Sequence, residues 1–112
     1  MVRLSKLAQD KGTYIILINF KDETGTAKAP DTMTYTLHDK DGNVINSKED
    51  QTVSSPSAQE PITLKGDDLA NSENENIPRY LTAWGTYTSD TYGSGLNWTQ
   101  VFEFYIEPAR IL

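Results

Sequence analysis

The chain contains no cysteine, and this absence removes several classes of protein at once. Without a thiol there is no disulfide, no cysteine nucleophile and no cysteine-based zinc site. Small secreted scaffolds of this size commonly depend on disulfides, so the composition favours a protein made in the cytoplasm. The one histidine, His38, has no acid and nucleophile arranged with it in the sequence, so nothing indicates Ser-His-Asp chemistry. We interpret His38 as a half-exposed residue at the end of a strand.

The chain also lacks a surplus of positive charge and a long apolar run. Ten Lys and Arg side chains stand against sixteen Asp and Glu, which gives a formal net charge of −6. Binding to phosphate groups needs the opposite balance, so we expect neither nucleic acid nor an anionic membrane as a partner. No apolar segment approaches the roughly 20 residues of a transmembrane helix. An acidic surface of this kind keeps free copies of a protein soluble.

A helical period of useful length is missing as well. In its place the sequence has six or seven short segments rich in β-branched and aromatic residues, with turn residues between them. The main segments expected to be strands are 13–20, 33–38, 44–45, 60–65, 79–87 and 101–106. Their spacing is typical of an all-β fold, an antiparallel sandwich of about seven strands of the immunoglobulin or fibronectin type III kind.

The length of 112 residues suits one domain with a modest core. We predict a single β-sandwich domain over residues 13–112, preceded by an N-terminal arm or edge strand over residues 1–12. Residues 89–97 are rich in Gly and Ser and are expected to form a flexible hairpin loop. The residues predicted to form the core are Tyr14, Ile16, Ile18, Phe20, Tyr35, Leu37, Leu64, Leu81, Tyr87, Phe102 and Phe104.

The segment 79–87 is the most informative part of the chain. Its odd positions, from Leu81 to Tyr87, suit a core, because they combine one large aliphatic residue, small residues and a tyrosine. Its even positions include Tyr80 and Trp84, where a soluble monomer normally carries polar residues. Successive side chains of a strand point to opposite faces, so both sets cannot be buried in one core. A large aromatic residue on an outer face favours a partner surface.

Ile15 and Leu17 form a second apolar stripe without an obvious place in the core. The candidate partner interface therefore comprises Tyr80, Trp84, Ile15, Leu17 and Trp98, with Tyr92 as a further exposed aromatic. Trp and Tyr anchor many protein interfaces. Two alternatives stay open: the aromatic rings stack on sugars, or Trp98 caps one end of the core and Trp84 lies under a loop.

Two acidic turns are weighed as chemical sites. Residues 39–43 superficially resemble the start of a calcium-binding loop, but strands flank them and the frame ends in Asp50 where such loops need Glu. Because Asp-Gly is a strong hairpin signal, we favour a plain hairpin turn, with calcium ligation by Asp39 and Asp41 as the alternative.

The adjacent pair Asp67 and Asp68 could supply two carboxylates for acid–base chemistry. Neighbouring side chains in a turn point apart, whereas a glycosidase needs its two carboxylates across a cleft. We therefore interpret this pair as a turn in which an Asp accepts a hydrogen bond from its own backbone. The sequence predicts no catalytic residue, no metal site and no cofactor, and hence no enzyme.

The order of the segments resembles that of small fibronectin-III-like or immunoglobulin-like β-sandwich virion proteins of tailed bacteriophages and prophages. The resemblance runs from about Thr13 to Ile106 and is carried by residues 20–25, 33–43, 62–69, 79–87 and 101–106. It implies a structural or accessory role in the virion, in the head, the neck or the tail. The chain departs from the pattern at Trp84 and Gly85, and in the arm before Thr13.

The predicted function is accordingly a non-enzymatic virion protein, made in the host cytoplasm and localised to the virion. It would be present in several symmetric copies and lay one sheet face, or its N-terminal arm, on neighbouring virion subunits. At least one apolar stripe, together with residues 1–12, would be covered in the particle. Deleting residues 1–12 is expected to leave the domain folded. The alternative is a glycan-binding module of a phage or bacterial adhesin.

Overall fold

The protein was analysed as a computed structural model, which describes residues 1–108. Among residues 1–108 the regular structure is β strands apart from one short 3-10 turn, so the predicted all-β class is confirmed. The elements are β1 (Val2–Arg3), β2 (Ala8–Gln9), β3 (Thr13–Asn19), β4 (Thr34–His38), β5 (Gln51–Thr52), β6 (Gln59–Lys65), η1 (Gly66–Leu69), β7 (Ile77–Ser89) and β8 (Gly93–Glu107).

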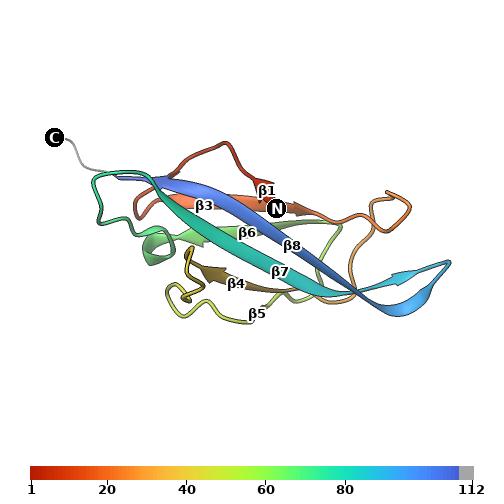
Figure 1. Ribbon diagram of the computed structural model, residues 1–112. Helices are drawn as coiled ribbons and strands as arrows, with labels where there is room; N and C mark the ends of the chain where they lie inside the picture. The colour runs from red at the N-terminus through yellow and green to blue at the C-terminus, as the bar shows by residue number, and fades with distance from the viewer. Residues whose placement is uncertain (109–112) are drawn as a thin grey trace.

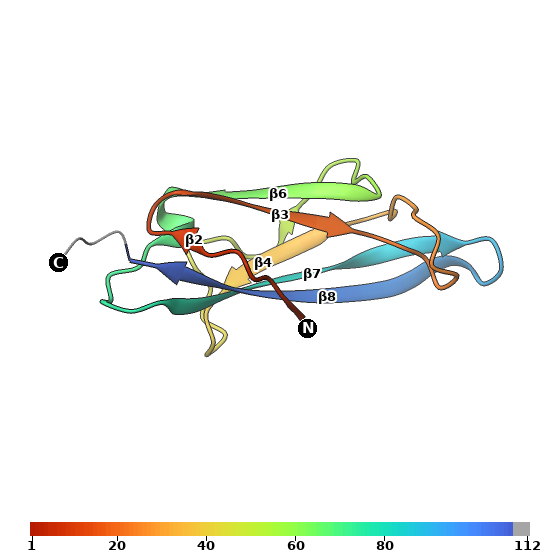
Figure 2. The same ribbon diagram turned by 90° about the horizontal axis from the view of Figure 1, so that it is seen from above.

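The strands form two sheets that face each other (Figures 1 and 2). The large sheet has six strands in the order β1-β8-β7-β4-β5, and β2 also pairs with β8. The small sheet consists of β3 and β6 alone, paired antiparallel from Thr13 opposite Lys65 to Asn19 opposite Gln59. The two layers are thus very unequal in width.

The core lies between the sheets and follows from the alternation of the strands. In β3, Tyr14, Ile16 and Ile18 are buried, while the residues between them are exposed. A strand with one buried face places every second side chain in the core. The buried apolar side chains are Ala8, Tyr14, Ile16, Ile18, Phe20, Met33, Leu37, Ile62, Leu64, Leu69, Leu81, Ala83, Trp98, Phe102, Phe104 and Ile106.

Most of the predicted core is found in this cluster, and two residues are exceptions. Tyr35 and Tyr87 are only half-buried and pack against the cluster from its rim. The Tyr87 hydroxyl donates a hydrogen bond to Glu23 3.1 Å away, at the molecular surface.

The β7–β8 hairpin is longer than the sequence analysis predicted. The segment 89–97, expected as a flexible loop, is mostly the start of β8, and the turn is confined to residues 90–92. Gly95 adopts a left-handed φ of 73° within the strand, which a glycine tolerates without strain. Pairing with β7 overrides the weak strand propensity of these small residues. The hairpin forms one end of an elongated molecule of 57 × 24 × 22 Å (Figure 1).

Residues 1–12 lie along the outer edge of β8 as two short strands. β1 and β2 both pair with β8 in parallel, so the predicted sandwich is not antiparallel throughout. Ala8 is fully buried in the core, and the Tyr14 hydroxyl donates a hydrogen bond to the Lys6 carbonyl. Deleting residues 1–12 would therefore remove part of the core, which weighs against the expectation that the deletion leaves the domain folded.

The predicted return strand at residues 44–45 is also corrected. Val44 makes one isolated bridge to His38, and the strand that pairs with β4 on the edge away from β7 is β5, at Gln51–Thr52. The segment between carries residues with left-handed φ, including Asn46 and Ser47, which interrupt an extended backbone.

Candidate interaction surfaces

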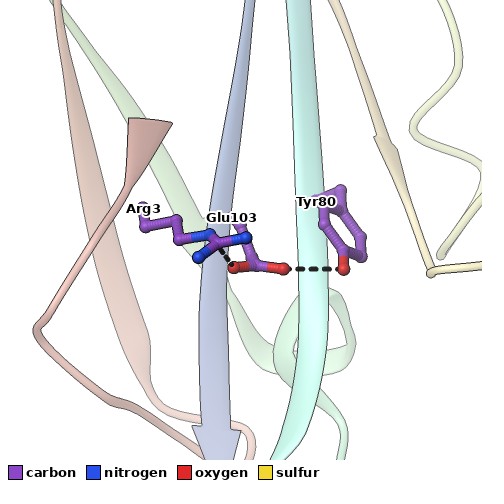
Figure 3. A network of polar contacts seen from close by, with 3 residues as sticks. All are labelled: Arg3, Tyr80 and Glu103. Carbon is purple, nitrogen blue, oxygen red and sulfur yellow. Dashed lines mark hydrogen bonds and ion pairs between the residues drawn. The ribbon is translucent and has the colours of Figure 1, made fainter. Parts of the chain in front are cut away.

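Tyr80 lies on the outer face of the large sheet and is held there by its own chain. Its ring stacks on that of His38, with centroids 5.7 Å apart and an interplanar angle of 13°. Its hydroxyl donates a hydrogen bond to Glu103 Oε2 at 2.7 Å. Arg3 Nε, from the N-terminal arm, lies 3.3 Å from the other oxygen of the same carboxylate (Figure 3). The Tyr80 side chain is thus half-buried and has internal partners.

The environment of Tyr80 also changes its titration. The hydrogen bond to Glu103 raises the pKa of the Tyr80 hydroxyl, and partial burial acts in the same direction. His38, expected as a half-exposed strand-end residue, is half-buried at the end of β4. Its Nδ1 donates to the Asp39 carbonyl at 3.0 Å, and its Nε2 lies 2.8 Å from the Thr82 hydroxyl. This arrangement positions the imidazole as a platform for Tyr80.

Trp84 comes four residues after Tyr80 in β7 and lies on the same outer face. It is half-buried, with Thr34 of β4 and Thr99 of β8 directly opposite it in the register of the sheet. Side chains opposite each other on one face of a sheet approach to about 5 Å, so strands on both sides of Trp84 shield its ring. The indole is partly covered by its own sheet rather than fully open to a partner.

Trp98 lies inside the protein, which corrects its place among the candidate interface residues. Only 8% of its surface is exposed, and its ring packs on Phe20 with centroids 5.2 Å apart. A Cβ at Gly85, directly opposite in β7, would stand 3.0 Å from Trp98 Nε1 and 2.0 Å from the Thr32 carbonyl oxygen. The glycine makes room for both. The alternative that Trp98 caps one end of the core agrees with this packing.

The burial of Trp98 had a signal in the sequence. Phe102 and Phe104 follow Trp98 at even offsets in the sequence, so a continuous strand places all three on one face. The expected loop at 89–97 hid this relation. The burial of Arg79 also had a signal, because Arg79 shares the odd face of β7 with the core residue Leu81.

Arg79 is buried and fastens η1 to the start of β7. Its guanidinium donates to the carbonyl oxygens of Asp68 at 2.8 Å and Ala70 at 3.2 Å. Burial lowers the pKa of Arg79, and the nearby Asp39 and Asp68 carboxylates oppose that shift. The Arg79 side chain therefore has a structural role in holding η1 against β7, and it does not face solvent.

Ile15 and Leu17 are the interface candidates that remain open to water. Their side chains are 60% and 46% exposed on the outer face of the small sheet. Thr63 and Pro61 of β6 stand opposite them, so the face has no charged residue at its centre. We call Ile15 and Leu17 the β3 stripe. No other layer of residues 1–108 covers this face, because β3 and β6 form the outermost sheet (Figure 2).

Further large apolar side chains are exposed outside the β3 stripe. In the N-terminal arm Met1, Val2 and Leu7 are 70%, 45% and 41% exposed. Tyr92 is 68% exposed at the tip of the β7–β8 hairpin, and Tyr105 is 41% exposed near the end of β8. These residues are scattered along the molecule, and single exposed apolar residues are common on soluble proteins.

The turn at Asp39 uses its carboxylate for the chain itself. Asp39 Oδ1 accepts hydrogen bonds from the backbone N–H groups of Asp41 and Asn43, and Oδ2 accepts one from the Asn43 amide. The bond from the Asn43 backbone is the main reason that the pKa of Asp39 is lowered. These contacts favour the plain hairpin turn over calcium ligation.

The pair Asp67 and Asp68 is divided between solvent and core. Asp67 is exposed, whereas Asp68 is buried and accepts hydrogen bonds from the Lys65 backbone N–H and the Asn46 amide. The interpretation as a self-bonding turn agrees with these contacts. Within residues 1–108, no group of three His, Asp or Glu side chains is placed to hold a metal, and no helix is long and apolar enough to cross a membrane.

Comparisons with other proteins add no assignment. No protein-family model, no curated protein and no solved structure matches the chain. Functional inference therefore rests on the surfaces described above.

Proposed function

We propose that this protein is a non-enzymatic structural or accessory component of a tailed-phage virion, and that it acts by binding neighbouring virion subunits. The observation that carries the proposal is the β3 stripe, two aliphatic side chains on a sheet face with no charged residue at its centre, in a strongly acidic chain. Exposed apolar residues grouped on one face are a feature of protein contacts. The virion setting comes from the resemblance of the strand order.

The same resemblance leads us to propose an immunoglobulin- or fibronectin-III-like identity for the fold. Two facing β-sheets, with β3 and β6 opposite β8, β7 and β4, are compatible with that family of sandwiches. The arm pairs with β8, and the small sheet has two strands only, so the chain is a reduced version of such a sandwich. This reduction leaves the β3 stripe at the surface.

Two residues first considered for the interface have a smaller part in the proposal. The Tyr80 hydroxyl and ring are engaged by Glu103 and His38, and Trp98 belongs to the core. Trp84 is half-buried, so its contribution to a contact is limited to the exposed part of its ring. We therefore assign the partner surface to the β3 stripe, with the exposed residues of the arm as a second element.

The virion role is tested on particles of the phage or prophage whose genome encodes the chain. Mass spectrometry of gradient-purified particles should detect the protein in a fixed ratio to the capsid protein. Incorporation of the Leu17→Ser variant should fall strongly, because a buried leucine contributes about 1.5–3 kcal/mol to a contact. The matched control is Thr63→Ser on the same face, which should be incorporated normally. Absence of the chain from purified particles would contradict the proposal.

A glycan-binding module is the second candidate, and Tyr92 and Trp84 are the residues that favour it. Tyr92 projects at the hairpin tip beside two glycines, and aromatic rings stack on sugars. Titration with host surface polysaccharide, followed by tryptophan fluorescence, distinguishes the two functions. A saturable change that is lost in Tyr92→Ser, which keeps both tryptophans as reporters, would favour the glycan function over the virion contact.

A further inference from the structure

The two edges of the small sheet differ in what they offer to another strand. In an antiparallel pair, residues alternate between those that exchange hydrogen bonds with the partner and those that direct N–H and C=O away. The backbone N–H of Phe20 donates to Ala58, and that of Gly66 donates to Gly12. In this register the even residues of β3 bond to β6, and the odd residues face the open edge.

The open edge of β3 is unprotected. Ile15 and Leu17 direct their backbone N–H and C=O groups outward there, and no strand of residues 1–108 other than β6 pairs with β3. Residues 13–19 contain no charged side chain and no proline. Natural proteins usually protect an exposed edge strand with lysine, proline or a bulge, because an unprotected edge pairs with other chains.

The opposite edge, on β6, has such protection. Pro61 occupies an outward-facing position and has no N–H to donate. The outward N–H of Lys65 already donates to Asp68 Oδ2, and the Gln59 carbonyl accepts from the Ser57 hydroxyl. The chain thus blocks one edge of this sheet and leaves the other one free.

We propose that the open edge of β3 pairs antiparallel with β3 of a second copy of this chain, across a two-fold axis at Ile16. The two small sheets would then form one continuous four-stranded sheet in the order β6-β3-β3-β6. The proposal deepens the assembly role proposed above by naming the partner and the mode of contact, and it rests on that role for its place in a particle.

The self-complementarity of β3 supports a second copy as the occupant. A two-fold axis at Ile16 places Ile15 opposite Leu17 of the second copy, and Thr13 opposite Asn19, in both halves. Apolar residues meet apolar ones and polar residues meet polar ones. The outward-facing odd residues form the pairs that exchange two backbone hydrogen bonds each. Both β3 stripes merge into one apolar patch, as a two-fold contact requires.

The first test measures the self-association of the full chain by analytical ultracentrifugation over a range of concentrations. The unchanged protein should form a dimer. Ile15→Lys should weaken it by at least about tenfold, because lysine on an edge strand opposes pairing. The matched control, Thr63→Lys, places the same charge on the same face but one strand further from the axis. It should change the dissociation constant little. Circular dichroism and melting temperature verify that both variants fold.

The second test determines the register by cross-linking, which the absence of native cysteine makes simple. An equimolar mixture of Ile15→Cys and Leu17→Cys chains should form a disulfide-linked dimer rapidly, because paired residues lie within the roughly 4.4–6.8 Å that a disulfide spans. Either variant alone should cross-link much more slowly, since identical positions are offset along the strands.

Three outcomes would overturn the inference. They are a chain that stays monomeric at all concentrations, a dimer weakened equally by Ile15→Lys and Thr63→Lys, and equal cross-linking of the single variants and the mixture. The second outcome would indicate face-to-face stacking of the small sheets. A monomer leaves the virion role intact, because a different subunit can cover the β3 stripe. Absence from particles leaves a dimer measured in solution intact.

Discussion

The outer faces of both sheets carry large apolar or aromatic side chains, but the surrounding strands cover these side chains to different extents. On the large sheet, Tyr80 is stacked on His38 and bonded to Glu103, and strands flank it on both sides. On the small sheet, Ile15 and Leu17 have β6 on one side and no strand of residues 1–108 on the other. The width of a sheet, rather than the size of a side chain, decides which outward residue is left for a partner.

The difference has a physical origin in the number of neighbours. A side chain in a central strand is flanked by residues on two adjacent strands, which remove much of its surface from water. An edge strand provides neighbours on one side only. The larger aromatic residues of the large sheet therefore lose more surface to their own chain than the smaller aliphatic residues of the small sheet.

The largest predicted effect concerns the inner face of the strand that carries Tyr80. Leu81 is fully buried, so Leu81→Ala should lower the free energy of unfolding by about 2–5 kcal/mol. Urea denaturation measures the change. A loss below about half a kcal/mol would mean that the two faces of β7 are assigned the wrong way round, and the comparison of outer faces would fail.

Gly85→Ala tests the close packing of Gly85 against the Thr32 carbonyl and the Trp98 indole. The added methyl group would overlap the Thr32 carbonyl and crowd the Trp98 indole, so backbone must move. We expect a loss of about 1–3 kcal/mol, as for other overpacked sites. The fluorescence of buried Trp98 should shift to longer wavelength in the same variant. Unchanged stability and fluorescence would show that the backbone at Thr32 can move away from the added methyl group at little cost.

Tyr80→Phe removes the hydroxyl that bonds to Glu103 and keeps the aromatic ring. The lost hydrogen bond to Glu103 should cost about 0.5–1.5 kcal/mol in thermal or urea unfolding. In the matched variant Glu103→Gln, the pKa of Tyr80 should fall toward the ordinary value of about 10, because the carboxylate that raises it is gone. Tyrosinate absorbance measures this titration. An unshifted titration would show that Glu103 does not hold Tyr80.

Acid should weaken the turn beside the large sheet and leave the β3 stripe unaffected, since the stripe has no titratable group. Backbone hydrogen bonds lower the pKa of Asp39, so its stabilising effect is complete above the unfolded value of about 3.9 and is lost as pH falls through the folded pKa. Asp39→Asn should show a smaller drop in melting temperature between about pH 5 and pH 3. An identical drop in both proteins would contradict this assignment.

The smallest effect is expected at the β3 stripe itself. The double variant Ile15→Thr with Leu17→Thr should change the free energy of unfolding by no more than about 0.5 kcal/mol, measured at concentrations too low for self-association. Both side chains face water in the single chain. A large loss would mean that the stripe stabilises the monomer and is not available to a partner.

The sequence was sufficient to predict the strands whose pattern is local. In β4 and β6, the alternation of apolar and polar residues identifies both the strand and its buried face, as at Leu37 and Leu64. In β3, the run of β-branched and aromatic residues identifies the strand, although both of its faces carry apolar residues. Turns are also found where the sequence predicts them, at Asp39 and Asp68, because an Asp side chain bonds to backbone only a few residues away. Short-range geometry controls all of these features.

The extent of β8, the burial of Trp98 and the pairing of the N-terminal arm depend on contacts between distant parts of the chain. The start of β8 has weak strand propensity and becomes a strand because β7 pairs with it, which in turn buries Trp98. The N-terminal arm pairs with β8 rather than with β3, so the open edge of β3 depends on a contact between distant parts of the chain. Alternation along a strand determines which side chains point outward, but the neighbouring strands determine which of them reach solvent.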